Sequence, residues 1–255
     1  MRSSARAVGL AGALVLGSLP APAPAADDVR CLDDAMLVFD ASGSMAGTDM
    51  NEVRPHIAKV REALAAVLPS VVSRRHLGLM VYGPGARPKC QNVELRLKPG
   101  ANSAETIMGE VNGLVPAGQT PLTSAVRGAA EELNFREKPA VVVLLTDGEE
   151  TCGGDPCRLA RELSAEASAL TIHVIAFKVR GETWLAPGSG SACMAEETGG
   201  LAITAQDKDE LIAALQKTLT CPLFSEARAS VIPGEVSKAS ETRNPAEELS
   251  KMQKN

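Results

Sequence analysis

The strongest strand signal in this chain of 255 residues is AVVVLL, at residues 140–145. An uninterrupted apolar run is typical of a strand that is buried on both faces of a sheet. Amphipathic helical patterns and further short apolar runs alternate on either side of it along the chain. We expect strands at 34–40, 77–82, 140–145, 171–177 and 201–204, an alternating edge strand at 93–97, and helices at 52–68, 103–111, 121–133, 157–169, 192–197 and 208–219. This alternation predicts an α/β fold with a mainly parallel sheet that helices cover on both faces.

The first 25 residues have the features of a secretory signal peptide. Arg2 and Arg6 precede an apolar run at 8–19, and Ala23-Pro24-Ala25 matches a small-residue cleavage site. The apolar run is too short to span a bilayer, which takes about 20 residues. We therefore expect cleavage near Ala25, a periplasmic or secreted mature protein, and no stable membrane anchor.

Composition narrows the classes of function for the rest of the chain. Only 2% of the residues are aromatic and the formal net charge is −5, which argues against nucleic acid as a partner. Residues 222–255 are polar and charged with few large apolar side chains, so we expect a disordered tail there. Residues 31–221 remain as the expected folded domain.

Cysteine usage fits the expected export of the protein. Six cysteines, an even number, lie in the expected domain: Cys31, Cys90, Cys152, Cys157, Cys193 and Cys221. Disulfides form and persist in exported proteins, but six cysteines allow about 15 pairings and the sequence alone does not choose among them. A zinc site is disfavoured, because Cys152 and Cys157 have no second cysteine pair to match them.

Oxygen-bearing side chains gather where expected strands end. The first strand ends in Asp40-Ala41-Ser42-Gly43-Ser44, the 140–145 strand runs into Asp147, and Thr120 lies in a loop that enters a helix. Ligand sites of open α/β sheets form just beyond the carboxyl ends of the strands. Two carboxylates and three hydroxyls suit a hard divalent cation, Mg²⁺ above all, with Mn²⁺ or Ca²⁺ as alternatives. The predicted ligands are Asp40, Ser42, Ser44, Thr120 and Asp147.

Each of these residues also has an ordinary structural interpretation. Asp40 or Asp147 could cap a helix, the serines could form turns, and Thr120 could precede a helix that begins with Pro121. The combination at the ends of strands is what indicates a metal site. Three acidic neighbours, Asp49, Glu149 and Glu150, are interpreted as a solvated rim, and His173 as a buried structural residue.

The pattern Asp40-x-Ser42-x-Ser44, followed by Thr120 and Asp147, resembles the metal-ion-dependent adhesion site of von Willebrand factor type A domains. The segments VFDASGSM, PAGQTPL and LLTDGEETCGGDPC are similar to those of bacterial exported members, and the resemblance extends from about Cys31 to Cys221. It implies a doubly wound, Rossmann-like sheet of six strands with one antiparallel edge strand, at 93–97.

The resemblance also implies roles for the predicted ligands. Ser42, Ser44 and Thr120 would bind the cation directly, and the two aspartates directly or through water. An Asp or Glu side chain of a protein partner would supply the last ligand.

A disulfide between Cys31 and Cys221 is a further implication of the resemblance. The first strand of the family begins, and its last helix ends, at the face opposite the metal. For the other four cysteines two schemes stay open. Either Cys152 pairs with Cys157 and Cys90 with Cys193, or Cys90 and Cys193 each pair with one cysteine of the Cys152/Cys157 loop.

The function that the resemblance implies is a binding module and not an enzyme: an exported protein that captures an acidic residue of a protein partner through a divalent cation. The alternative is an accessory factor for the assembly or metal loading of a periplasmic enzyme. A metal-dependent hydrolase is less favoured, because no serine lies in a G-x-S-x-G sequence and no histidine lies near the proposed site in the sequence.

Overall fold

The computed structural model describes residues 31–221, apart from residues 32, 51, 86–89 and 179–189. Its strands are β1 (Asp34–Asp40), β2 (Leu77–Tyr82), β3 (Val93–Gly100), β4 (Pro139–Thr146), β5 (Ala169–Phe177) and β6 (Ala202–Ala205). They form one sheet in the order β3-β2-β1-β4-β5-β6. Every neighbouring pair is parallel except β2 and β3, which are antiparallel. The predicted fold class is therefore confirmed, while the predicted signal peptide and tail lie outside the described residues.

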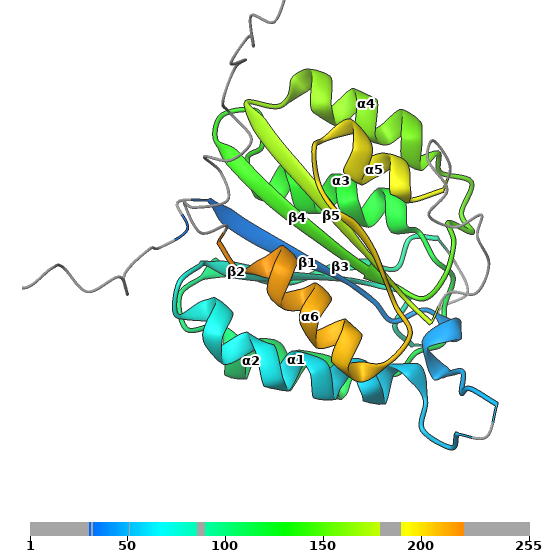
Figure 1. The fold of residues 1–255 in the computed structure, drawn as a ribbon. Helices are drawn as coiled ribbons and strands as arrows, with labels where there is room; N and C mark the ends of the chain where they lie inside the picture. Colours follow the sequence, from blue (N-terminus) through cyan, green and yellow to red (C-terminus); the bar gives the residue numbers. More distant parts are fainter. Residues whose placement is uncertain (1–30, 32, 51, 86–89, 179–189, 222–255) are drawn as a thin grey trace, which may run out of the picture.

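Helices pack on both faces of the sheet and make a three-layered molecule (Figure 1). They are α1 (His56–Val72), α2 (Ala104–Gly113), α3 (Leu122–Glu132), α4 (Pro156–Glu166), α5 (Ala192–Glu197) and α6 (Lys208–Leu219), with a short 3₁₀ helix, η1 (Gly43–Ala46). Helices α1, α2 and α6 cover one face, and α3, α4 and α5 cover the other.

A hydrophobic core lies on each face of the sheet, and the central strand β1 contributes side chains to both. Its side chains alternate, so that Leu37 and Phe39 pack in the core beneath α1 and α6, while Met36 and Val38 pack in the core beneath α3. All four are fully buried. Burial on both faces explains why the strands read as continuous apolar runs and not as alternating patterns.

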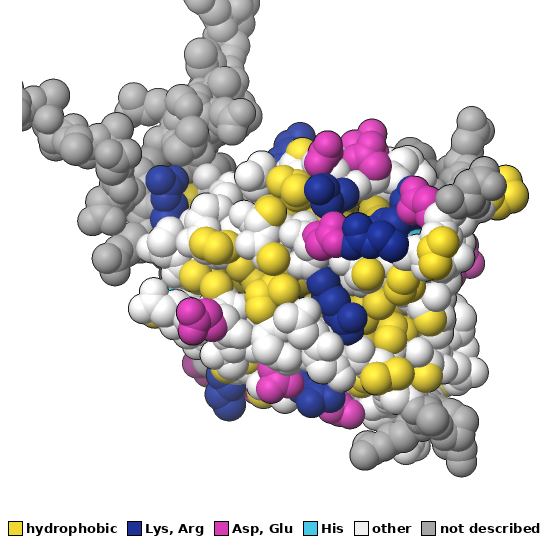
Figure 2. Space-filling view, turned by 90° about the horizontal axis from the view of Figure 1, so that it is seen from below, with side chains coloured by type: hydrophobic (Ala, Val, Ile, Leu, Met, Phe, Trp, Pro, Cys, Tyr) yellow, Lys and Arg dark blue, Asp and Glu magenta, His cyan; other side chains and the backbone are white. Residues whose placement is uncertain are grey.

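The outer surface over α1, α2 and α6 carries charges of both signs (Figure 2). Lys and Arg side chains lie next to Asp and Glu side chains there, with apolar side chains between them. None of the helices that the structure describes is both long and apolar enough to cross a bilayer.

The start of α1 differs from the predicted helix at 52–68. The helix begins at His56, because Pro55 before it is extended, with φ −67° and ψ 156°, and it continues to Val72. Residues 47–50 and 52–55 instead belong to a loop that projects from the domain, on which Val53 is 93% exposed. Val53 therefore does not belong to the buried stripe that includes Ile57, Val60 and Leu64.

Three disulfides use all six cysteines. Cys31 pairs with Cys221, as the resemblance implied, and joins the start of the domain to its end. The other pairs are Cys90–Cys152 and Cys157–Cys193. The scheme with a local Cys152–Cys157 bridge is therefore wrong, and the scheme in which Cys90 and Cys193 each pair into that loop is confirmed.

Candidate metal centre

The predicted ligands lie on three loops at the carboxyl ends of neighbouring strands. Backbone hydrogen bonds join two of these loops to each other and to the end of β2: Ala41 N–H donates to the Tyr82 carbonyl at 2.8 Å, Gly43 N–H to the Gly118 carbonyl at 2.9 Å, and Gly118 N–H to the Gly83 carbonyl at 2.9 Å. Parallel strands end at a common edge of the sheet, so residues far apart in the sequence meet there.

Gly83 allows these loops to approach one another. Its φ is +74°, and a Cβ atom at this position would lie 2.7 Å from Ser42 Cα and 2.8 Å from the Gln119 carbonyl oxygen. A side chain would therefore force the Ser42 loop and the Thr120 loop apart, in a backbone conformation that glycine adopts most readily.

Hydrogen bonds link four of the five predicted ligands into one chain. Ser42 Oγ lies 3.0 Å from Ser44 Oγ, and Ser44 Oγ donates to Asp147 Oδ1 at 2.5 Å. Asp40 accepts from the Ser42 backbone N–H at 2.7 Å through Oδ1, and from Thr146 Oγ1 at 2.7 Å through Oδ2. Both oxygens of Asp40 are therefore held in place by neighbouring donors.

Thr120 faces the same space from the third loop. A Cβ atom at Gly148 would lie 3.2 Å from Ser44 Oγ and 3.9 Å from Thr120 Oγ1, so the missing side chain of Gly148 leaves room between the two hydroxyls. The structure thus brings the five predicted residues together. Their role as metal ligands stays a prediction.

The electrostatics of this cluster favour a cation. Asp40 is fully buried, and its burial together with the negative charge of Asp147 raises its pKa to about 6. The Asp147 side chain is 0% exposed. Among the described residues, no Lys or Arg forms an ion pair with either carboxylate, so two buried acidic groups lie together without a permanent positive charge. A divalent cation would supply that charge.

The chemistry of the donors sets the class of cation. Within the part of the chain that the structure describes, no group of three or more His, Cys, Asp or Glu side chains is placed to hold a metal ion. A cation here would therefore depend on the hydroxyl oxygens of Ser42, Ser44 and Thr120 as well as on the aspartates. An all-oxygen set of this kind fits Mg²⁺, Mn²⁺ or Ca²⁺.

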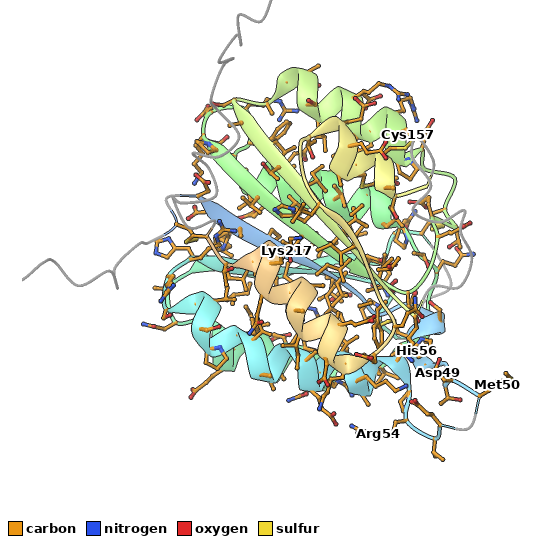
Figure 3. The ribbon with its side chains drawn as sticks, in the orientation of Figure 1. Asp49, Met50, Arg54, His56, Cys157 and Lys217 are labelled. Carbon is orange, nitrogen blue, oxygen red and sulfur yellow. A yellow bond between two sulfur atoms is a disulfide. The ribbon has the colours of Figure 1, made fainter. Side chains whose placement is uncertain are left out.

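His56 also lies in this site, although it is not part of the sequence motif that predicts the ligands. Its Nδ1 lies 2.8 Å from Asp147 Oδ2, and its ring packs edge-on against Phe177 with centroids 5.9 Å apart. Figure 3 shows it at the start of α1, beside Asp49. The sequence offered one signal for this contact, which is the position of His56. The helix after the Asp40–Ser44 loop begins at the edge of the sheet where that loop lies, so its first residue is close to the site.

The three acidic neighbours, Asp49, Glu149 and Glu150, differ in their exposure and contacts, although all three were predicted to form a solvated rim. The Asp49 side chain is only 11% exposed and pairs with Lys59 at 2.7 Å and Lys178 at 2.9 Å, which hold its pKa well below the usual range. Glu150 accepts hydrogen bonds from Thr123 N–H at 2.9 Å and Thr123 Oγ1 at 2.7 Å at the start of α3. The rim interpretation is therefore wrong for Asp49 and Glu150, because both are engaged in structural contacts, and it holds for the exposed Glu149.

His173 has the structural role that was predicted. It lies within β5, partly buried, and its Nδ1 accepts a hydrogen bond from the Leu201 backbone N–H at 2.9 Å. Burial, and after it the charge of Arg75, lowers the pKa of His173 to about 4. The ring is therefore neutral at physiological pH and lies away from the candidate metal centre.

Comparisons with known proteins place this chain in a family. The family model of the von Willebrand factor type A domain matches residues 34–218. The chain is 30% identical over 227 residues to YwmD, an uncharacterized protein of Bacillus subtilis (strain 168), and the match covers 83% of this chain and 95% of that protein.

Solved structures share the fold at lower identity. The PilB minor pilin of Streptococcus sanguinis superposes with a TM-score of 0.55 at 13% identity, covering 73% of this chain and 60% of the pilin. Proximal thread matrix protein 1 of the mussel byssus, with a zinc-occupied MIDAS motif, superposes with a TM-score of 0.51 at 20% identity. That match covers 75% of this chain, which spans 46% of the mussel protein.

Proposed function

Because this chain belongs to the von Willebrand factor type A domain family, we propose that it is an exported binding module that captures an acidic side chain of a protein partner through a divalent cation. The observation that carries the proposal is the convergence of five oxygen donors, from three loops, around the space that Gly148 leaves free. Such a module binds its partner and performs no chemical conversion.

Ser42, Ser44 and Thr120 would hold the cation together with Asp40 and Asp147. When bound, the cation supplies positive charge and an open position for an anionic oxygen. Asp40 is oriented by the Ser42 N–H and by Thr146 Oγ1, so its charge is fixed without being neutralised. His56 orients Asp147 from the opposite side to Ser44.

The placement of His56 also favours a binding role over hydrolysis. Catalysis by a serine nucleophile needs a base within hydrogen-bond reach of the hydroxyl. His56 instead contacts Asp147, and Asp147 contacts Ser44, so the carboxylate lies between the imidazole and the hydroxyl. This order is the reverse of the one in which histidine takes the proton of serine.

Export is part of the proposal. Three disulfides are typical of proteins that fold in an oxidising compartment. The proposed signal sequence at residues 1–25 would deliver the chain there, to the periplasm or the exterior.

The direct test is cation binding by the purified protein. Isothermal titration calorimetry with Mg²⁺, Mn²⁺, Ca²⁺ and Zn²⁺ should detect one site, with Zn²⁺ included because the mussel protein holds zinc at its MIDAS motif. Asp147→Ala should abolish binding, whereas Glu149→Ala, at an exposed acidic residue nearby, should bind as the parent does. Equal binding by Asp147→Ala and the parent would overturn the metal site.

Partner capture tests the second half of the proposal. A partner retained on the immobilised protein should be released by EDTA and should rebind when Mg²⁺ or Mn²⁺ is restored. Asp147→Ala should fail to retain it, and mass spectrometry would name it, which also separates an adhesion partner from an enzyme under assembly. Full retention by Asp147→Ala would rule out a cation bridge.

A further inference from the structure

A pocket lies at the amino end of the sheet, opposite the candidate metal centre. It has a volume of about 440 Å³. The segments before β1 and β2, strands β4 and β5, and the end of α6 contribute to its wall. Its lining residues include Arg75, His173, Lys217, Asp33, Val141 and Leu201. Nothing in the proposed cation site uses this pocket.

Arg75 is the unusual residue of this pocket. It is only 5% exposed, and its Nε atom is buried without a hydrogen-bond partner. Over the described ranges, no acceptor takes a hydrogen bond from its guanidinium and no carboxylate lies within ion-pair distance of it; the influence of Asp33 is felt only at longer range. Burial lowers the pKa of Arg75 accordingly. Buried charges in proteins are normally paired, so this guanidinium lacks an anion.

Two further polar side chains of the pocket, His173 and Lys217, supply nitrogen donors, whereas the carboxylate of Asp33 is an acceptor. His173 accepts from Leu201 N–H through Nδ1, so its neutral ring carries the proton on Nε2. Lys217 is exposed in the last turn of α6, at the pocket (Figure 3). The hydroxyls of Thr218 and Thr220 already donate to the carbonyls of Ala214 and Gln216.

We propose that this pocket binds a small organic monoanion, a carboxylate on a compact apolar body, with the Arg75 guanidinium as its main contact. The planar guanidinium presents parallel N–H donors that match the two oxygens of a carboxylate. Val141 and Leu201 offer apolar wall for the rest of the molecule. The pocket is large enough for a molecule of this kind.

Charge balance selects a monoanion over phosphate. Arg75 and Lys217 are positive, His173 is neutral and Asp33 is negative, so the wall carries one net positive charge. One carboxylate neutralises it. A phosphate dianion would leave one negative charge uncompensated in a space that is partly closed to water.

The test uses the full mature chain and hexanoate as the probe, followed by isothermal titration calorimetry. Hexanoate should bind saturably at one site, while 1-hexanol, which has the same apolar body without the charge, should bind at least about tenfold more weakly. Inorganic phosphate at the same concentration should not displace hexanoate. Failure of hexanoate to bind, equal binding of hexanol, or displacement by phosphate would each overturn the proposal.

Variants assign the binding to Arg75. Arg75→Met keeps the aliphatic stem and should weaken hexanoate binding about tenfold or more, because a charge-assisted hydrogen bond is lost. Arg74→Met, at the exposed neighbouring arginine, is the matched control and should change binding less than about twofold. Arg75→Lys keeps the charge without the planar donors, so its hexanoate affinity should lie between those of Arg75→Met and Arg74→Met. This variant preserves the test if Arg75→Met does not fold. Unchanged affinity in Arg75→Lys and in any folded Arg75→Met would overturn the assignment, and cation binding should be the same in all folded variants.

Discussion

The two ends of the sheet carry opposite chemistry. The carboxyl end gathers oxygen acceptors around buried Asp40 and Asp147, whereas the amino end gathers nitrogen donors around buried Arg75. Each end leaves a charge that its own residues do not neutralise. One scaffold can therefore hold two incomplete electrostatic sites, because the sheet between them is apolar and keeps them apart.

Removal of the Cys31–Cys221 disulfide should have the largest effect and should be confined to stability. The bond closes a loop with a sequence separation of 190 residues, so the double Cys→Ser variant should lose about 5 kcal/mol in the chain-entropy model. Urea unfolding of the parent and the variant, with the other two disulfides intact, measures this loss in the free energy of unfolding. Cation affinity of the folded fraction should stay within about twofold, since the bond lies at the other end of the sheet.

A matched comparison uses Cys157 and Cys193, whose separation is 36 residues. Their double Cys→Ser variant should lose about 1.5 kcal/mol less than the first, because the loop is shorter. A reversed order of the two losses would show that loop length does not govern these bonds.

The next effect is the dependence of stability on pH at the amino end. The pKa of His173 is about 4 in the folded protein, below its ordinary value of 6.5. As the pH falls, the unfolded chain therefore takes up the proton at a higher pH than the folded protein does. The stabilising contribution is complete above about pH 6.5 and is lost as the pH falls towards 4. We expect a loss of about 2 kcal/mol over this window, after allowance for partial exposure.

His173→Asn keeps an acceptor for Leu201 N–H and removes the titration. The quantity to measure is the difference between parent and variant in the free energy of unfolding, at several pH values with EDTA present. The difference matters because Asp40, whose pKa is raised, contributes a slope of opposite sign in both proteins. Parallel curves for parent and variant would contradict the assignment to His173.

At the candidate metal centre, loss of His56 should change cation affinity more than it changes stability. His56→Ala removes the contact between Nδ1 and Asp147 Oδ2, so the carboxylate loses one of its two restraints. Groups that orient a metal ligand are worth about tenfold or more in affinity. Calorimetry with Mn²⁺ measures the change, and hexanoate binding at the other end should be unaffected. An affinity equal to the parent would remove His56 from the site.

The smallest expected effect is that of a single methyl group. Gly148→Ala places a Cβ atom 3.2 Å from Ser44 Oγ, so Mn²⁺ affinity should fall a few-fold, with a stability change of less than about 1 kcal/mol. Gly109→Ala is the control, because nothing lies within 4 Å of its Cβ position in α2. It should leave Mn²⁺ affinity unchanged and raise stability by about 0.5–1 kcal/mol. Equal Mn²⁺ affinities in the two variants would show that the space at Gly148 is not needed.

The cluster of Asp40, Ser42, Ser44 and Asp147 at the carboxyl end of the sheet could be predicted from the sequence, and the pocket at the amino end could not, for a physical reason. Asp40, Ser42 and Ser44 share one short motif, and Asp147 directly follows a strong strand signal, so local order already indicates their meeting point. The pocket instead takes single residues from many elements. Arg75 follows another arginine and reads as an exposed charge, and Lys217 reads as an ordinary lysine in the last turn of a helix.

His56 shows the same limit within the candidate metal centre. Its contact with Asp147 depends on where α1 begins, and the helical periodicity placed that start at residue 52. The extended Pro55 moves the start to His56 and turns the imidazole towards Asp147. Helix boundaries depend on a few local contacts, whereas the apolar periods that determine the sheet and its helices extend over whole elements.

The Cys31–Cys221 bond also has a mechanical consequence. It joins the chain where the domain begins to the chain where it ends, so tension between the two flanking segments passes through one pair of sulfur atoms. The sheet carries none of that tension and does not unravel from its termini. A pull from a partner held at the carboxyl end would instead run lengthwise along β1, where the hydrogen-bond ladders to β2 and β4 resist together in shear.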